Sequence, residues 1–259
     1  MWIQEIKGNY KQCSSGCAVQ NFLWRHDRQP LYVMDNHLAA AWCWMEECDK
    51  TDVYNFMHID QHADLLNNLS IKDYGFFVDS NLTFEEYHGL TKTLRGRKID
   101  PPIFRWDNYI IPMMRLFPNW FDKSFYAVLD DIDLHTRRSI GFLPYLHQNQ
   151  LTLAGQVETA FTSAWNELDE MCGKEIHKWI VNLDMDYFFK DNEQMLTHSY
   201  ILDLSDRIHR FIDNIQVLTV AFSPECCGGW NAAEHVFDVF CDGFPEFAEF
   251  LIARNYSLS

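Results

Sequence analysis

The sequence predicts an α/β protein with three layers, α/β/α, in which helices cover both faces of a mostly parallel sheet. Short buried runs rich in β-branched and aromatic residues alternate with amphipathic helical segments along the chain. Several of these runs end directly in histidine or aspartate, residue types that can bind metals. Binding sites of α/β proteins typically lie at the carboxyl edge of a parallel sheet. The length of 259 residues suffices for a full core, so we expect residues 1–259 to form a single domain.

The composition limits the partners that the protein can have. The chain has 37 acidic and 21 basic residues and a formal net charge of −16, which argues against nucleic acid and anionic membranes as partners. We find no run of 18 apolar residues and no signal peptide, and therefore expect a cytoplasmic protein. Among the cysteines, Cys13 and Cys17 could bind zinc, but small buried thiols are the simpler interpretation.

The first predicted junction between a strand and a helix lies at His37. Residues 1–29 predict only a short irregular or hairpin segment. The run Leu31–Met34 predicts a short buried strand, and residues 38–47 form helix readily. His37 stands between the two, either as a residue that starts the helix or as a ligand at the sheet edge.

The stretch from Val53 to Leu65 has the highest density of ligand-type residues. A predicted strand over residues 53–59 ends in Asp60, His62 and Asp64. Two carboxylates and an imidazole at the end of a parallel strand can converge on a cation. The alternative is that these residues only cap a following helix.

The middle of the chain predicts one helix and one aromatic segment. The helix covers residues 83–92 and is capped by Asn81 or Thr83. Pro101 and Pro102 break whatever follows them. The aromatic segment, residues 105–120, could belong to the core or line a groove.

A further strand is predicted over residues 124–129. It ends in Asp130, Asp131 and Asp133. These carboxylates lack a nearby histidine cluster, and the basic residues at 137–138 could pair with them, so we favour a surface turn over a metal site. The clearest helical periodicity of the chain follows, over residues 153–171.

Two aspartates follow the next buried strand, residues 179–183. They are Asp184 and Asp186, with a single Met between them and apolar residues on both sides. Burial of unpaired carboxylates is costly, so these two need a cation or several hydrogen-bond donors. A helix over residues 200–212 and a strand over residues 217–222 come after them.

The last strand leads into a loop, residues 223–230, that contains Glu225, Gly228 and Gly229. Glycines permit close approach of the backbone to a ligand, which makes Gly228 and Gly229 candidate substrate-binding positions. A final helix carries Phe247, Phe250 and Leu251. Ligand-type residues thus follow four predicted strands, and a parallel sheet would place all of them at the same edge.

Three motifs resemble those of the ureohydrolase superfamily, which has the arginase and deacetylase fold. They are Asp60-Gln-His-Ala-Asp64, Asp184-Met-Asp186 and the upstream Asp35-Asn-His37 at a helix start. The residues of these motifs are most similar to those of the peptide arginases, although the motifs cover a small fraction of the chain. Peptide arginases act in the maturation of ribosomally synthesised peptides. They convert arginine side chains of a precursor peptide to ornithine and release urea.

The resemblance implies two manganese ions, Mn²⁺, with Asp60 and Asp184 as bridging ligands. One ion would be held by His37, Asp60, Asp64 and Asp184. The other would be held by His62, Asp60, Asp184 and Asp186. In such enzymes a hydroxide between the two ions attacks the guanidinium carbon. The implied ligands include no cysteine, which favours manganese over a structural zinc.

The resemblance also suggests residues that act on the substrate. Glu225 falls where ureohydrolases place a carboxylate against the guanidinium group, although it could be an ordinary exposed loop residue. His88 is the candidate proton donor, and an exposed helical histidine is the alternative. Asp107 is a candidate for substrate binding. The signatures that hold free arginine are not recognisable after Asp64, which favours an arginine within a peptide.

Two other functions are compatible with the same residues. A deacetylase-like amidohydrolase with one metal would need only Asp60, His62 and one distal aspartate. A peptide-binding module without catalysis could keep the fold and an aromatic groove. We expect an arginine-containing precursor peptide as the partner, and the sequence predicts no oligomeric state.

Overall fold

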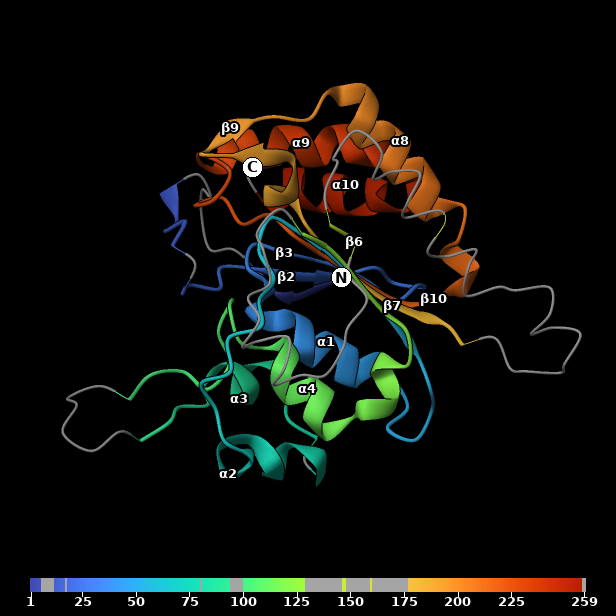
Figure 1. Cartoon of the computed structure of the whole chain (residues 1–259). Coiled ribbons are helices and arrows are strands. Elements are labelled where there is room, and N and C mark those ends of the chain that lie inside the picture. The colour runs from blue at the N-terminus through green and yellow to red at the C-terminus, as the bar shows by residue number, and fades with distance from the viewer. Residues whose placement is uncertain are drawn as a thin grey trace, which may run out of the picture.

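An eight-stranded sheet lies at the centre of the described part of the chain, in the order β1-β2-β3-β10-β7-β4-β5-β6 (Figure 1). The computed structural model describes residues 1–5, 12–16, 18–79, 81–93, 100–128, 146–147, 159 and 177–257. The strands of the sheet are β1 (Trp2–Gln4), β2 (Leu23–Arg25), β3 (Leu31–Met34), β4 (Asn55–Asp60), β5 (Ser124–Val128), β6 (Leu146–His147), β7 (Trp179–Asp184) and β10 (Ile215–Ala221). A separate hairpin pairs β8 (Phe189–Lys190) with β9 (Glu193–Gln194).

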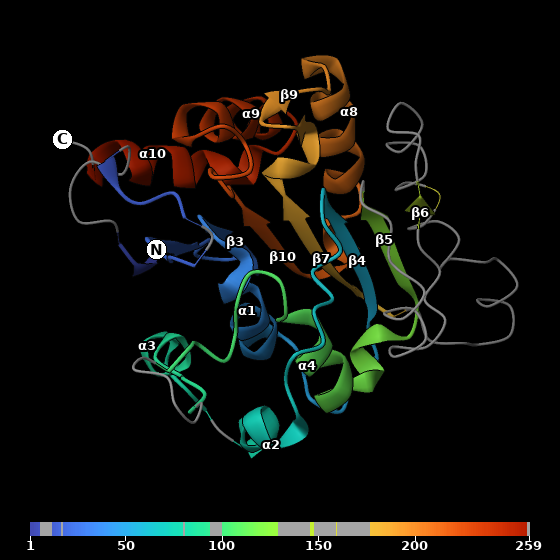
Figure 2. The same cartoon turned by 60° about the vertical axis from the view of Figure 1, so that its left-hand side comes forward.

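The sheet is mostly parallel, as predicted. Strands β3, β10, β7, β4, β5 and β6 run parallel to their neighbours, whereas β1 and β2 are antiparallel additions at the β3 edge. Figure 2 shows the central strands side by side in this order. Within residues 1–29, for which an irregular or hairpin segment was expected, β1 and β2 pair antiparallel and add two strands to the sheet.

Helices lie on both sides of the sheet, which is consistent with three layers (Figures 1 and 2). On one side are α1 (Ala40–Glu47), α2 (Ile71–Tyr74), α3 (Phe84–His88) and α4 (Ile110–Leu116). On the other side are α8 (His198–His209), α9 (Trp230–Asp242) and α10 (Ala248–Ser257). Short 3₁₀ helices are η2 (His37–Ala39), η3 (Gly75–Asp79), η4 (Pro118–Phe121), η5 (Met185–Phe188), η6 (Ile212–Asn214) and η7 (Pro245–Phe247). None of the helices in the described ranges is long and apolar enough to cross a membrane.

Several helices differ from the prediction, among them α2 and α4, which were not predicted as separate elements. Helix α3 is capped by Thr83, whose hydroxyl accepts from the Glu86 N–H, and it ends at His88 because Gly89 follows. Helix α8 begins at His198, earlier than predicted, because Thr197 caps it. Helix α9 was not predicted as a separate element. The predicted helix over 153–171 and the turn at 130–133 lie outside the described residues, apart from Thr159.

Both faces of the sheet are buried against helices. On β10, Leu218 and Val220 join the core under α8, α9 and α10, whereas Val217 and Ala221 join the core on the side of α1 and α4. Successive side chains of a strand point to opposite faces, so a shift of one residue would exchange the two cores. The pairing register of the central strands, and with it the position of each strand end, is therefore strongly specified.

Candidate metal centre

Four neighbouring parallel strands end at the same edge of the sheet, and each delivers polar side chains there. His37 follows β3, Asp60 ends β4, Asp184 ends β7, and Ser223 lies two residues after β10. The turn after β4 adds His62 and Asp64, and η5 after β7 adds Asp186. The structure thus brings together all six residues that the sequence suggested as metal ligands.

Three of the aspartates are oriented by backbone N–H groups. The His62 N–H donates to Oδ1 of Asp60 (2.6 Å), and the Asp186 N–H donates to Oδ1 of Asp184 (2.8 Å). The Gln61 N–H donates to Oδ1 of Asp186 (3.1 Å). One oxygen of each carboxylate is thereby held by the backbone, and the other oxygen takes part in the contacts between these side chains.

The inner group, defined by His37, Asp60, Asp64 and Asp184, is almost fully buried. Nδ1 of His37 lies 3.6 Å from Oδ2 of Asp60 and 3.8 Å from Oδ2 of Asp64. Its Nε2 contacts Oδ2 of Asp184. The hydroxyl of Ser223 donates to the same oxygen of Asp184 (2.5 Å). Ligand atoms of His37, Asp60 and Asp184 lie within 4.8 Å of one another, so this group could hold a metal ion.

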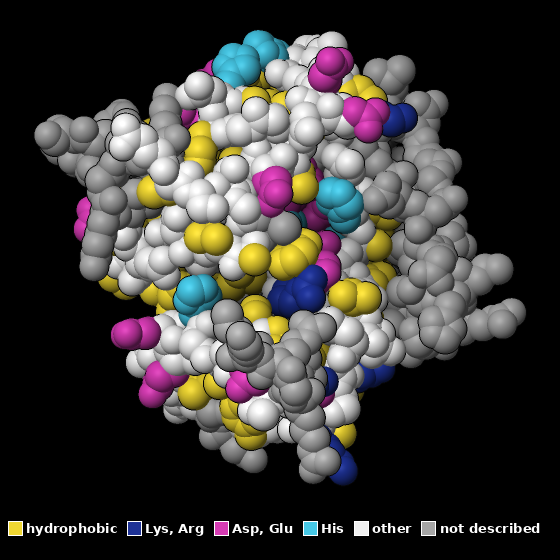
Figure 3. Space-filling model, turned by 90° about the vertical axis from the view of Figure 1, so that its left-hand side faces the viewer, with side chains coloured by type: hydrophobic (Ala, Val, Ile, Leu, Met, Phe, Trp, Pro, Cys, Tyr) yellow, Lys and Arg dark blue, Asp and Glu magenta, His cyan; other side chains and the backbone are white. Residues whose placement is uncertain are grey.

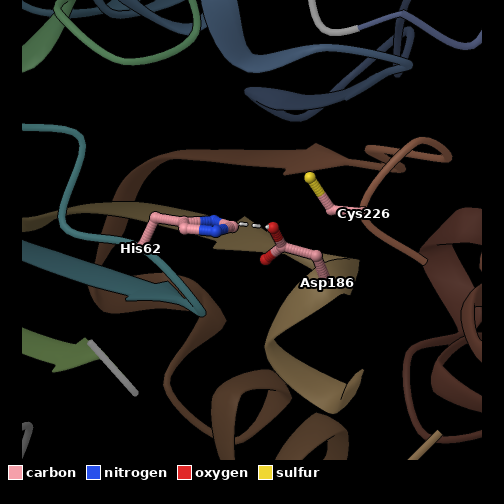
Figure 4. A group of neighbouring side chains, drawn as sticks. All are labelled: His62, Asp186 and Cys226. Carbon is pink, nitrogen blue, oxygen red and sulfur yellow. Dashed lines mark ion pairs between the residues drawn. The ribbon is translucent and has the colours of Figure 1, made fainter. Parts of the chain in front are cut away.

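The outer group, defined by His62, Asp186 and Cys226, lies next to the inner one (Figure 4). Nδ1 of His62 is 3.0 Å from Oδ2 of Asp186, and the His62 side chain is 40% exposed. Ligand atoms of the three residues again lie within 4.8 Å of one another. This group includes a cysteine, which the ligand set implied by the sequence did not. His62 and Cys226 are thus more exposed than the residues of the inner group.

Two buried carboxylate oxygens show that the residues fit a cation. Oδ2 of Asp60 and Oδ2 of Asp64 are buried and have no hydrogen-bond partner. Burial raises the pKa of both carboxyl groups well above the usual value, and the charges of neighbouring aspartates raise it further. A cation between these oxygens would satisfy them and relieve the repulsion, which is the usual solution for clustered buried carboxylates.

The negative charge of the site raises the pKa of the imidazoles of His37 and His62. Burial by itself would lower the pKa of His37, but the charges of Asp184 and Asp64 raise it to about 9. Hydrogen bonds to Asp186 and Asp60 raise the pKa of His62 to about 12. The surroundings thus stabilise positive charge at both positions. Bound metal ions would supply that charge in place of the two protons.

A buried polar network supports the inner group from the interior of the sheet. The side-chain amide of Asn182 donates to Nδ1 of His58 and to the hydroxyl of Tyr109, both at 3.0 Å. That hydroxyl lies 3.3 Å from Nδ1 of His37. The Thr219 hydroxyl donates to Oδ1 of Asn182 (2.8 Å). Because Nδ1 of His58 accepts, its Nε2 carries the proton and donates to the carbonyl of His62 (3.1 Å).

His58 is a histidine that the sequence analysis did not select. It also belongs to a group of possible ligands with Asp60 and Asp64. Burial, followed by the positive charge of His37, lowers the pKa of His58 to about 3, so it is neutral. A signal for this network is present in the sequence. His58 on β4 and Asn182 on β7 are polar residues inside mostly apolar strands, where each needs a buried partner.

The loop of residues 223–229 carries Glu225 and also Cys226, the third member of the outer group. Its backbone is closed by bonds from the N–H of Cys226 to the carbonyl of Ser223 (2.9 Å) and from the N–H of Gly229 to that of Pro224 (2.7 Å). Glu225 is exposed on this loop. Gly228 has a φ of +79°, and a Cβ there would lie 2.7 Å from the carbonyl oxygen of Asn192, so glycine is needed. Gly229, with a φ of +116°, directly precedes α9.

The remaining two candidates are His88 and Asp107. His88 is exposed at the end of α3, where its ring stacks on Phe84 with centroids 5.9 Å apart. Asp107 pairs with Arg105 (2.8 Å), and its backbone carbonyl accepts from the N–H of Leu66. Asp107 is thus next to the segment that follows Asp64. Within the described ranges, no hydrogen bond or ion pair joins His88 or the Asp107 carboxylate to the six residues.

On the surface, histidine and acidic side chains meet near the middle of the face shown in Figure 3, between hydrophobic side chains. A scan of the chain against protein-family models gives no match, and neither does a search of curated proteins. The function is therefore inferred from the site itself.

Proposed function

We propose that this chain is a metal-dependent hydrolase that converts arginine side chains of a peptide to ornithine with release of urea. The observation that carries the proposal is the convergence of six histidine and aspartate side chains at one sheet edge. The buried oxygens of Asp60 and Asp64 without partners support a cationic occupant. The motif resemblance to peptide arginases supports the choice of reaction.

The inner group would hold one Mn²⁺ ion through His37, Asp60, Asp64 and Asp184. The second ion would be held by His62, Asp60, Asp184 and Asp186. Two such ions supply Lewis acidity and lower the pKa of a bound water, which makes a nucleophile available near neutral pH. The mixed carboxylate and imidazole ligands of the inner group suit manganese.

Glu225 would bind the guanidinium group of the substrate. It is exposed, and it directly precedes Cys226, a member of the outer group. A carboxylate and a planar guanidinium match as a two-point pair, which would orient the guanidinium carbon. The net charge of −16 would also favour the approach of a cationic side chain.

The direct test is incubation of manganese-loaded protein with a set of arginine-containing peptides. Each converted arginine should lower the peptide mass by about 42 Da, the loss of CH2N2 in a metal-assisted hydrolysis, and one urea should form per conversion. The same peptides with lysine in place of arginine serve as the control. A metal-loaded protein that leaves varied arginine peptides unchanged would contradict the proposal.

The substitution Glu225→Gln tests substrate binding separately from metal binding. Loss of a charged hydrogen bond of about 1.5–3 kcal/mol should lower kcat/KM for the arginine peptide by roughly 10- to 100-fold. The metal content should not change, because Glu225 is not among the proposed ligands. The control is Glu193→Gln in β9, which also removes an exposed carboxylate. Equal activity of the two variants would exclude Glu225 as the guanidinium-binding residue.

Metal stoichiometry distinguishes this proposal from an amidohydrolase with one metal. A single site built from Asp60, His62 and one distal aspartate would leave the buried His37 and Asp64 unexplained. Elemental analysis of the purified protein should therefore give two ions per chain. One ion per chain at saturating metal would favour the amidohydrolase instead.

A further inference from the structure

The outer group contains three side chains that come from three different segments of the chain. His62 follows β4, Asp186 lies in η5, and Cys226 lies in the loop after β10. In Figure 4 the imidazole of His62 and the carboxylate of Asp186 point toward each other, and the side chain of Cys226 lies beside them. Their ligand atoms lie within 4.8 Å of one another. A metal ion binds nitrogen at about 2.0–2.1 Å and sulfur at about 2.3 Å, so two of its ligand atoms lie about 3–4.4 Å apart. Only small movements of the three side chains would therefore be needed to bind one ion.

The position of Cys226 is determined by contacts that do not involve a metal. Its N–H donates to the carbonyl of Ser223 (2.9 Å), and Ser223 itself bonds to Asp184 through its hydroxyl. The side-chain amide of Asn192, in the turn between β8 and β9, is placed to donate to the carbonyls of Glu225 and Cys226, at 3.1 Å each. Two independent segments thus hold the cysteine backbone next to the outer group.

The adjacent Cys227 has a different environment, although it belongs to the same loop. Cys227 is fully buried, and its thiol donates to the carbonyl of Phe222 (3.3 Å). It is part of the core under α8, α9 and α10. Cys226, in contrast, is only partly buried. The two neighbouring thiols therefore provide a matched comparison between a packing role and a ligand role.

We propose that Cys226 supplies a thiolate ligand to the metal ion held by His62 and Asp186, so that the outer position binds Zn²⁺ more tightly than the inner position does. This inference rests on the proposed metal centre but not on the identity of the substrate. Thiolate ligands favour borderline ions such as Zn²⁺ and Co²⁺, whereas carboxylates and water suit Mn²⁺. When the ion binds, the thiol of Cys226 loses its proton to solvent and a metal–sulfur bond forms, without any redox change.

Cobalt(II) provides a spectroscopic test, because it can replace zinc and reports on sulfur directly. The metal-free protein is titrated with Co²⁺ under anaerobic conditions. We expect visible absorption from the bound ion and, in addition, a near-ultraviolet band of thiolate-to-cobalt charge transfer. In Cys226→Ser the near-ultraviolet band should disappear while the visible absorption persists, because His62 and Asp186 remain. The Cys227→Ala variant should keep both bands.

Competition between metals gives a second readout. The affinity for Zn²⁺ should fall by about tenfold or more in Cys226→Ser, whereas the affinity of the inner position for Mn²⁺ should change little. If Cys226→Ser does not fold, the Cys227→Ala variant tests the role of Cys226, because Cys226 is then the remaining thiol of the loop. A near-ultraviolet band in this variant would support Cys226 as the ligand. Visible cobalt absorption without the near-ultraviolet band in the wild type would overturn the role of Cys226 as a ligand but not the proposed metal centre. Absence of any cobalt binding would overturn the proposed metal centre as well.

Discussion

Replacement of Asp64 by Asn is expected to raise the stability of the metal-free protein and to remove most of the stabilisation that metal provides. Oδ2 of Asp64 is buried without a hydrogen-bond partner, 3.8 Å from Nδ1 of His37. Burial and the charge of Asp60 raise the pKa of Asp64, so its ionised form destabilises the folded metal-free state. Asparagine removes that charge, and we expect a gain of about 1–3 kcal/mol in the free energy of unfolding at neutral pH.

The raised pKa of Asp64 also predicts how the stability of the metal-free protein depends on pH. Because the folded-state pKa of Asp64 lies above its unfolded value of about 3.9, the folded state binds more protons in the interval between them. Stability should therefore fall as the pH rises from the unfolded pKa through the folded one. The Asp64→Asn variant should lose less stability over this interval. Urea unfolding at several pH values with a chelator present measures the difference.

With metal present the wild type should gain more stability than the variant. A ligand at about 100 times its Kd stabilises the folded state by about 2.7 kcal/mol, and the wild type should show a gain of this kind with Mn²⁺. Asp64→Asn should show little gain, because one ligand of the inner group has lost its charge.

The variant at position 64 has a matched control elsewhere in the chain. Asp64 has a φ of +51°, a region that asparagine tolerates, so the backbone should not be strained. Asp191, exposed in the β8–β9 turn, has a φ of +52°. Asp191→Asn should change neither the metal-free stability nor the response to metal. If Asp64→Asn responds to Mn²⁺ as the wild type does, Asp64 is not a metal ligand.

The central strands and their polar ends could be predicted from the sequence because their signals are local. An apolar run that stops at Asp60 or Asp184 shows both where the strand ends and which side chains stand there. The parallel order of such strands then places the side chains at one edge. The observed strands β4 and β7 differ from the predicted ranges by one or two residues, which leaves the ligand-type positions unchanged.

Other features depend on contacts between distant segments, and the sequence does not reveal them. Cys226 belongs to the outer group because its loop bonds to Asp184 through Ser223 and lies within hydrogen-bond distance of Asn192. His58 lies in a strand buried on both faces, where alternation of polar and apolar residues cannot separate a site residue from the core. The edge strands β1 and β2 are too short for a periodic signal, and they form only because β3 offers a free edge.

The substitution Asn182→Leu should have the largest effect on stability. Asn182 is 1% exposed, and its side chain bonds to His58, Tyr109 and Thr219. Leucine is similar in size but bonds to none of them, so three buried polar groups lose a partner. We expect a loss of about 3–5 kcal/mol in the free energy of unfolding, since the individual costs of about 1–3 kcal/mol are not additive. Urea unfolding with a chelator present measures it without a contribution from metal.

Asn55 on β4 provides the control, because it is as deeply buried but is not part of the network. Its amide makes one bond, to the carbonyl of His177 (3.1 Å), and its Oδ1 has no hydrogen-bond partner. Asn55→Leu should therefore cost about 1 kcal/mol or less. Asn182→Leu should also weaken metal binding by roughly 10- to 100-fold, because the Tyr109 hydroxyl that contacts His37 loses its own support. Equal stability of the two leucine variants would show that the network does not stabilise the site.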